Sequence, residues 1–491
     1  MKILLVYPKY PDTFWSFKHA LKFIARKAAN PPLGLLTVAA MLPKDWDLKL
    51  VDLNIRKLKD KEIKKADYVF ISAMSAQRNS VLEIMRRCRR LKKKIAAGGP
   101  LFTGEPKAFS RVDHLILNEA EITLPEFLRD LRNGRARHIY RTELKANIEK
   151  TPAPAWDLIK FRHYGNMNLQ YSRGCPFNCE FCDITSLFGR TPRTKTKEQV
   201  LGELNALYER GYRGALFFVD DNFIGNKFKL KTEILPAISE WMEKRKYPFA
   251  FITEASINLA DDDELMTMMA DAGFDNVFIG IESPDEDSLK ECNKIQNNNR
   301  DLVASVKKIQ SFGFQVQGGF IVGFDNDNET IFARMSKFIQ DSNIVMAMVG
   351  LLSAPTGTRL YARLKKENRI LNEMTGDNTD ATLNFIPKMN KEKLILGYKK
   401  VLHSIYSDKH FYLRVKDFLK NHNPKRIRPV RFEIDYIGAF FKSIFWLGIV
   451  KRGRWYYWKI FFWTLFRKPK LLPMAITFMV YGFHFQKIFG I

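Results

Sequence analysis

Three of the five cysteines in this chain lie in the stretch YSRGCPFNCEFCDI at 171–184. They follow the spacing C-x3-C-x2-C and are Cys175, Cys179 and Cys182. Thiolates are preferred ligands of zinc and of iron–sulfur clusters. A structural zinc site normally takes a fourth protein ligand, but the nearest histidines along the chain are His163 and His403. The spacing therefore favours an iron–sulfur cluster with one open iron, over an incomplete zinc site or a chance group of buried thiols.

The cysteine loop follows the first of six apolar segments that alternate with helical patterns. The candidate strands are 167–172, 215–220, 249–254, 276–282, 316–323 and 345–352. The helical patterns between them lie near 196–210, 229–245, 261–272, 300–312 and 328–340. Strands that alternate with helices predict a parallel sheet. Six such units within 166–355 predict a parallel barrel of fewer than eight strands.

Polar and acidic residues follow these strands, at the edge where parallel barrels carry their chemistry. They are Asp220, Asp221, Asn222, Glu254, Glu282, Ser283, Gly323 and Asp325, with the turn at 354–357 after the last strand. Any one of them could be an ordinary helix cap. Because they recur at every strand end and join the cysteine loop, we expect one shared site.

Residues 1–135 show a separate alternation of strands and helices, which begins with KILLVY at 2–7. This alternation predicts a doubly wound parallel sheet, in which ligands bind outside the carboxyl ends of the strands. The candidate residues at those ends are Ser72, Met74, Ser75, Gly98, Gly99, Pro100, Glu119 and Glu121. The segment 136–165, which contains the proline-rich TPAPAWDL, predicts a linker.

Composition limits the class of protein. A chain of 491 residues predicts two or three domains. The net charge of +27 indicates an acidic partner (nucleic acid, a nucleotide cofactor or an anionic membrane) or a lysine-rich solvated surface. Five cysteines argue against a disulfide framework and for a reducing compartment. The apolar run at the N-terminus is short and predicts a first strand, not a signal peptide.

The region 356–491 predicts a helical domain whose character changes near residue 424. Between residues 424 and 470 the sequence has twelve basic and two acidic side chains. Aromatic runs such as IFWLGIV and WYYWKIFFWTLF are interrupted before they reach membrane-spanning length. This pattern favours amphipathic segments lying in the plane of a membrane interface. A packed core or oligomer surface and a nucleic-acid surface remain alternatives.

The motif CPFNCEFC, with Phe181 before the third cysteine, resembles the radical SAM signature. The resemblance implies a 4Fe–4S cluster on the three cysteines and S-adenosylmethionine (SAM) on its open iron. One electron, from an external flavodoxin or ferredoxin type of donor, then cleaves SAM to a 5′-deoxyadenosyl radical, which takes hydrogen from an unactivated carbon. The implied SAM-binding residues are Phe181, Asp220, Asp221, Asn222, Glu254, Glu282, Ser283, Gly319 and Gly323. Many family members have Gly-Gly-Glu where this chain has Asp220-Asp221-Asn222.

Residues 1–135 resemble the cobalamin-binding domain that precedes many radical SAM barrels. The resemblance implies that the eight candidate residues of this region bind cobalamin, with small side chains that let the corrin approach the backbone. The motif D-x-H-x-x-G, which supplies a histidine below cobalt in some cobalamin proteins, is absent. The cobalt is therefore expected to have no protein histidine below it.

The whole chain most closely resembles the cobalamin-type radical SAM branch that includes the hopanoid ring-A methylase. The resemblance includes YPKYPDTFW, PPLGLLTVAAMLP, VDDNFIGN and the added C-terminal domain. It implies an α/β fold: a doubly wound cobalamin domain, a partial (β/α)6 barrel and an α-rich C-terminal domain. It also implies a polycyclic isoprenoid lipid substrate. The expected location is cytoplasmic, at the inner face of the cell membrane.

Three functions are compatible with this resemblance. The favoured one is cobalamin-dependent methylation of a membrane lipid, which uses two SAM molecules per turnover. The second is radical ring or C–C bond formation on a lipid without methyl transfer, which the branch also includes. The third is an RNA-modifying radical SAM enzyme, which would bind RNA with a steep dependence on salt.

Metal content tests the interpretation of the cysteines. Protein purified without oxygen from cells supplied with cobalamin should contain about four irons and about one cobalt per chain. The Cys175→Ala variant should lose iron, because one of three ligands is missing. Elemental analysis of iron, sulfide, cobalt and zinc is the measurement. A cluster without cobalt would contradict methylation, and zinc in place of iron would contradict the radical chemistry.

Overall fold

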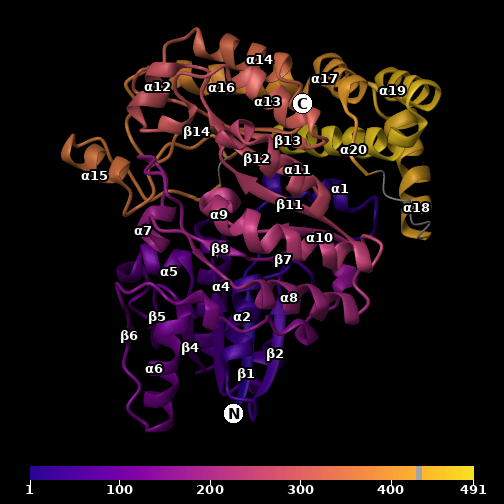
Figure 1. Cartoon of the computed structure of the whole chain (residues 1–491). Coiled ribbons are helices and arrows are strands. Elements are labelled where there is room, and N and C mark those ends of the chain that lie inside the picture. Colours follow the sequence, from indigo (N-terminus) through magenta and orange to yellow (C-terminus); the bar gives the residue numbers. More distant parts are fainter. Residues whose placement is uncertain (378, 427–433) are drawn as a thin grey trace.

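The computed structural model describes residues 1–377, 379–426 and 434–491. Two parallel sheets follow one another along the chain, and a group of helices follows them (Figure 1). This arrangement confirms the predicted fold class. Residues 427–433 of the predicted basic segment lie outside the described residues.

The first sheet has six parallel strands in the order β2-β1-β3-β4-β5-β6. Its strands are β1 (Lys2–Tyr7), β2 (Asp47–Asp52), β3 (Tyr68–Ser72), β4 (Lys94–Gly98), β5 (His114–Ile116) and β6 (Ile139–Tyr140). The connecting helices are α2 (Leu33–Met41), α3 (Asp60–Lys65), α4 (Arg78–Arg90), α5 (Pro100–Gly104) and α6 (Ala120–Arg132). Helices cover both faces and bury a separate apolar core on each, so the central strands β1 and β3 are nearly continuous apolar runs, whereas the edge strand β2 is partly exposed.

One difference from the sequence prediction is β6, which lies within the predicted linker and extends the first sheet beyond β5. A strand of two residues is too short to produce a periodic pattern in the sequence. Its inclusion in the sheet depends on pairing with β5, which is a tertiary contact.

The second sheet has the order β14-β13-β12-β11-β10-β7, and every pair is parallel. Its strands are β7 (Met167–Leu169), β10 (Gly214–Phe218), β11 (Phe249–Ala255), β12 (Phe274–Glu282), β13 (Gln315–Val322) and β14 (Ala347–Leu351). The outer helices are α8 (Lys197–Glu209), α10 (Leu235–Lys244), α11 (Asp263–Ala272), α13 (Leu302–Ser311) and α14 (Ile331–Asp341). Because β7 and β14 do not pair, the barrel is open on one side.

The inside of this barrel is hollow. Side chains that point outward under the helices, such as Leu216, Phe251 and Val277, are fully buried. Side chains that point inward, such as Phe217 and Ile252, are only half-buried and line a cavity. An ordinary barrel interior is filled by side chains, so this alternation leaves room for a ligand.

The C-terminal helices pack beside the barrel. They are α15 (Arg359–Lys366), α16 (Lys391–Tyr406), α17 (Asp408–Asn421), α18 (Ile434–Ser443), the π-helix η11 (Ile444–Val450), α19 (Arg454–Arg467) and α20 (Leu472–Phe489). Helix α20 lies against α1 (Lys18–Leu21), and Phe485 stacks on Phe14 with ring centroids 4.2 Å apart. The segment at residues 14–21 and the last helix of the chain therefore pack against each other, while the two termini themselves lie far apart (Figure 1). Within the described residues, no helix is both long and apolar enough to cross a membrane.

A buried ion-pair network joins the first domain to the short strands β8 and β9 beside the cysteine loop. The Glu119 carboxylate, which follows β5, accepts from Arg173 and Arg193 at 2.8 Å each. Arg173 also pairs with Glu121 at 3.0 Å. Arg173 lies in β8 (Ser172–Arg173) immediately before the cysteine loop, and β8 pairs with β9 (Arg193–Thr194). The network thus ties the first domain to the base of the cysteine loop.

Removing Glu119 should destabilise this junction, because two buried arginines would lose their shared carboxylate. The Glu119 side chain is 1% exposed, and breaking a buried pair typically costs about 3–5 kcal/mol. We expect Glu119→Ala to lower the free energy of unfolding by that amount in denaturant titration.

The matched control is Glu143→Ala, since Glu143 is 80% exposed and pairs with Arg141 on the surface. An exposed pair contributes about 0–1 kcal/mol. Equal losses in the two variants would contradict a special role for the buried network.

Candidate functional site

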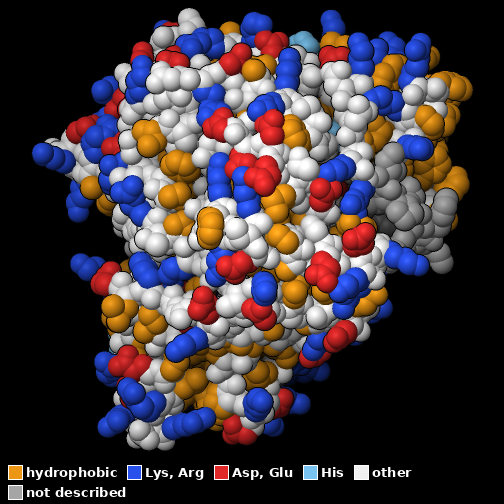
Figure 2. All heavy atoms as spheres, in the orientation of Figure 1, with side chains coloured by type: hydrophobic (Ala, Val, Ile, Leu, Met, Phe, Trp, Pro, Cys, Tyr) orange, Lys and Arg blue, Asp and Glu red, His pale blue; other side chains and the backbone are white. Residues whose placement is uncertain are grey.

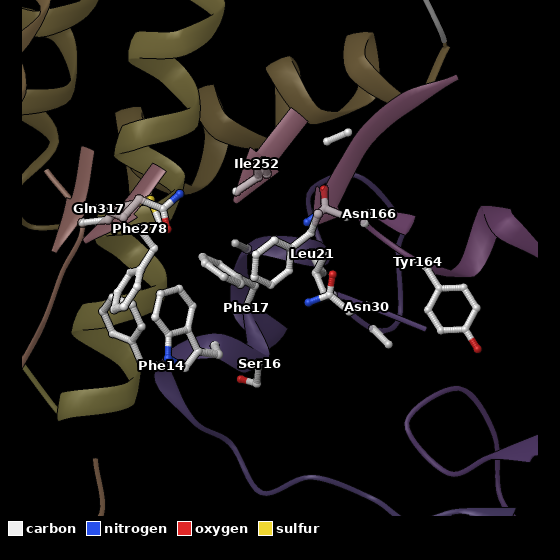
Figure 3. Close-up of a pocket in the computed structure, with 18 of the residues that line it drawn as sticks. Phe14, Ser16, Phe17, Leu21, Asn30, Tyr164, Asn166, Ile252, Phe278 and Gln317 are labelled. Atoms are coloured by element: carbon white, nitrogen blue, oxygen red, sulfur yellow. The ribbon is translucent and has the colours of Figure 1, made fainter. Parts of the chain in front are cut away.

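A cavity of about 2200 Å³ runs along the inside of the barrel and extends to loops at the carboxyl ends of the first sheet. Three parts of the chain line it: loops of the first domain, the inner face of the barrel, and helices α18 and α20. Figure 3 shows one region of it, with Phe14, Phe17 and Phe278 toward one side and Asn30, Asn166 and Tyr164 toward the other. Such a volume exceeds that of a single ordinary small-molecule pocket, so it has room for more than one large ligand.

The residues that follow β10 accept hydrogen bonds from the backbone at the start of the cysteine loop. Asp220 accepts hydrogen bonds from the backbone N–H groups of Tyr171, at 3.1 Å, and Ser172. Asp221 accepts from the N–H of Gly174 at 2.7 Å. Two consecutive carboxylates therefore fix the backbone immediately before Cys175.

Gly174 is required at this turn. Its φ of +98° is a conformation that favours glycine, and a Cβ there would lie 3.0 Å from the carbonyl oxygen of Thr191. The loop then runs through the three cysteines into α7 (Ile184–Phe188). This turn directs the cysteine loop toward the carboxyl rim of the barrel.

Cys182 lines the cavity, while Cys179 is buried. Burial raises the pKa of the Cys175 and Cys182 thiols, so thiolates here need positive charge nearby. Lys294 supplies positive charge, which lowers the pKa of the Cys175 and Cys182 thiols against the effect of burial. Its ammonium group also donates a hydrogen bond to Glu282 at 2.7 Å. Burial lowers the pKa of Lys294, but Glu282 and Cys179 outweigh that effect and hold it above the usual value.

The three thiols fit an iron–sulfur cluster better than a single ion. Among the described residues, no three His, Cys, Asp or Glu side chains converge to hold one metal ion. A four-iron cluster instead takes each thiolate on a different iron. The donor set is all sulfur and reaches the edge of the cavity at Cys182, so the three thiolates would hold three irons of a cluster and leave the fourth for another ligand.

Four of the nine predicted SAM-binding residues line the cavity. Glu254 and Glu282 both line it. The pKa of Glu254 is raised to about 8, mainly by burial and to a smaller extent by the carboxylates of Asp221 and Asp220. Phe181 lines the cavity and contacts the ring of Phe324 at a centroid distance of 6.3 Å. Gly319 is also part of the lining, and a Cβ there would lie 2.6 Å from the Phe278 ring.

The other predicted SAM-site residues support the rim and do not line the cavity. Asp220 and Asp221 hold the cysteine loop, and burial raises their pKa values to about 7 and about 6. Asn222 binds Ser256 and so joins the ends of β10 and β11. Ser283 is buried and accepts from the N–H of Asp285, and Gly323 donates to Asp327.

The first domain contributes four of its eight predicted residues to the cavity: Ser72, Met74, Ser75 and Pro100. Gly98 and Gly99 lie behind them, and a Cβ on Gly99 would lie 3.0 Å from the Ala73 carbonyl oxygen. Glu119 and Glu121 belong to the ion-pair network with Arg173.

Several lining residues were not found by sequence reasoning. Trp15 and Phe17 come from the segment before α1, and Trp15 contacts Phe278 at a centroid distance of 5.4 Å. Asn30 and Asn168 line the cavity, and the structure shows no hydrogen-bond partner for either buried Oδ1. Such orphaned acceptors indicate donors on a ligand. Only the aromatic run FWSF in the sequence could have suggested a site here.

Comparison with known proteins agrees with this division of the chain. Residues 23–128 match the family model for the B12 binding domain, 169–339 match the Radical SAM superfamily, and 358–491 match a domain of unknown function (DUF4070). In solved structures, the fold is similar to the cobalamin-dependent SAM radical enzyme OxsB with a TM-score of 0.63, at 16% identity over 99% of this chain and 79% of OxsB. It is also similar to the radical SAM methyltransferase TsrM of Kitasatospora setae with a TM-score of 0.61, at 15% identity over 91% and 95%.

The fold and the site therefore define a cobalamin-type radical SAM enzyme, whose cofactors are a 4Fe–4S cluster, SAM and cobalamin. An uncharacterized methyltransferase of Synechocystis is 41% identical over 99% of this chain and 91% of its own length. The hopanoid C-2 methylase of Rhodopseudomonas palustris is 35% identical over 78% of this chain and 73% of its own length. The chain belongs to the family of cobalamin-dependent radical SAM C-methyltransferases that includes the hopanoid methylases. The resemblance predicted from the cysteine motif is confirmed.

Asp220 should control how well the cysteine loop holds iron. In Asp220→Ala the N–H groups of Tyr171 and Ser172 lose their acceptor, at about 1–3 kcal/mol for each unpaired buried group. We expect a lower unfolding midpoint and less iron per chain in protein purified without oxygen.

The control is Asn328→Ala, because Asn328 also accepts from a backbone N–H and a hydroxyl but is exposed. It should keep its iron. Full iron content in Asp220→Ala would contradict the anchoring role.

Proposed function

We propose that this protein methylates an unactivated carbon of a polycyclic isoprenoid lipid. One observation supports the proposal most directly: a single cavity is lined by Cys182 of the cluster loop, by Ser72 and Met74 of the B12 domain, and by the aromatic side chains of the barrel interior. The two cofactor sites and an apolar substrate chamber would then share one space. The lipid class comes from the hopanoid C-2 methylase, which is a relative.

The residues of the chain have distinct roles in this proposal. Cys175, Cys179 and Cys182 hold the cluster, while Ser72, Met74, Ser75 and Pro100 lie against cobalamin. When bound, the cluster supplies the electron that cleaves SAM, and methylcobalamin supplies the methyl group. The proposed SAM contacts are four residues that line the same cavity as Cys182: Phe181, Glu254, Glu282 and Gly319.

The walls of the chamber orient the substrate and exclude water. Trp15 contacts both Phe17 and Phe278, with the ring centroids of Trp15 and Phe17 6.3 Å apart, and all three side chains line the chamber. Flat ring systems pack well on aromatic faces. A dry chamber also protects reactive species from side reactions. These residues would therefore position a flat lipid ring system rather than take part in bond breaking.

The boundaries 1–135, 136–165, 166–355 and 356–491 remain our proposed division of the chain. The family-model matches at 23–128, 169–339 and 358–491 fall within three of these parts. We further propose a flavodoxin or ferredoxin type of electron donor, and a peripheral position at the inner face of the cell membrane, where such a lipid would be found.

Isotope transfer tests the proposed reaction. Anaerobic enzyme reconstituted with cobalamin, reductant and methyl-deuterated SAM should add one deuterated methyl group to a lipid in a hopanoid-containing extract, seen by mass spectrometry. 5′-Deoxyadenosine and S-adenosylhomocysteine should form in equal amounts, because hydrogen removal and cobalamin remethylation each use SAM.

Boiled enzyme and the Cys179→Ala variant are the controls. 5′-Deoxyadenosine with a modified but unmethylated lipid would instead support ring or C–C bond formation. Modification of RNA and not of lipid would reject the lipid proposal.

A further inference from the structure

Helices α18, η11 and α19 expose an unusual number of large apolar side chains. These residues, which we call the aromatic face, are Phe441, Phe445, Trp446, Ile449, Val450, Trp455, Phe462 and Phe466. Figure 2 shows hydrophobic side chains gathered over α19 at the right edge of the molecule. Exposed apolar patches of this kind usually mark a surface that another molecule covers.

The charges along the helices of the aromatic face are almost all of one sign. In the sequence from 434 to 491, Asp435 at the start of α18 is the single acidic residue. Exposed basic side chains on and beside the face are Arg452, Arg454, Lys459, Arg467 and Lys470. A partner protein surface would normally require charges of both signs, whereas an anionic phospholipid surface attracts basic residues of one sign. Aromatic side chains between basic ones match the interfacial region of a bilayer.

The substrate cavity reaches this same surface. Its lining extends from Cys182 and Glu282 at the barrel rim to Ile437 and Phe441 of α18. Both α18 residues are exposed, at 45% and 62%. On the opposite side of this opening the lining includes Leu472, Pro473 and Met474 at the start of α20. Phe441 therefore belongs both to the aromatic face and to the wall of the cavity.

We propose that the aromatic face sits on an anionic phospholipid bilayer, and that the opening between α18 and α20 admits lipid from the bilayer directly into the cavity. The proposed membrane docking is supported by the exposed residues alone, while the proposed lipid entry rests on the proposed lipid substrate. Transfer of a large apolar molecule through water is unfavourable in proportion to its exposed area. An opening that faces the acyl chains removes that step.

Vesicle flotation of the holoenzyme tests docking. The parent should float with vesicles of phosphatidylglycerol and phosphatidylcholine, less so with phosphatidylcholine alone, and less at high salt, because basic side chains are screened. Replacing Trp455 and Phe466 together by glutamate should weaken partition by about tenfold or more. Both side chains are highly exposed, at 71% and 77%, so the fold should tolerate the change.

The matched control is Phe228→Glu. Phe228 is also 77% exposed but lies in α9 (Lys227–Lys229), on the outside of the barrel. It should float like the parent. Parent protein that stays with the unbound fraction, or equal losses in control and double variant, would overturn the docking proposal.

A second variant tests the entrance. Ala439 of α18 lines the cavity, so Ala439→Phe should narrow the opening without altering the aromatic face. Vesicle binding should be unchanged, while uptake of the fluorescent polycyclic sterol dehydroergosterol from the vesicles, followed by energy transfer from tryptophan, should fall severalfold. Leu465→Phe on α19, outside the cavity lining, is the control for added bulk.

The outcomes separate this inference from the proposed function. Normal uptake in Ala439→Phe, or no uptake by the parent, would overturn the entrance. Normal docking and uptake without any methylated lipid would count against the proposed reaction and leave the surface assignment intact. Methylation of detergent-dispersed lipid without vesicle binding would overturn the docking and leave the reaction intact.

Discussion

The arrangement of this protein depends on one buried carboxylate, Glu119, held between Arg173 and Arg193. A charge at this depth is stable only if it is paired, so the two arginines cannot move away without a large cost. Arg173 immediately precedes the cysteine loop. The first domain and the loop that would carry the cluster are therefore fixed relative to each other, which is what two cofactors acting on one substrate require.

A second constraint comes from the open side of the barrel. A closed barrel of this size would be filled by its own side chains, but β7 and β14 do not pair here. The segment that holds Trp15 packs against α20 through Phe14 and Phe485, and Trp15 contacts Phe278 of β12. Trp15 and residues of α20 therefore both line the cavity. This explains how the C-terminal helices, far from the cysteines in sequence, become part of the same cavity.

The C-terminal helices form a packed core on one side, which is one of the alternatives that their sequence left open. Leu447, Tyr457, Ile460 and Phe478 are buried in a packed core. The opposite sides of the same helices expose the aromatic face. The sequence did not predict which side of these helices is buried, because both sides are apolar and no polar stripe separates them.

The sequence by itself predicted the parallel strands of both sheets except β6 and marked the three cysteines as candidate cluster ligands, because local periodicity and ligand spacing are properties of neighbouring residues. It also placed Glu254, Glu282 and Ser72 at strand ends that meet. Tertiary structure alone decided that Asp220 supports the loop, that Glu119 pairs across domains, and that Lys294, Trp15, Asn30 and α20 join the site. These roles depend on contacts between distant segments, and no pattern along the chain records which distant segments will touch.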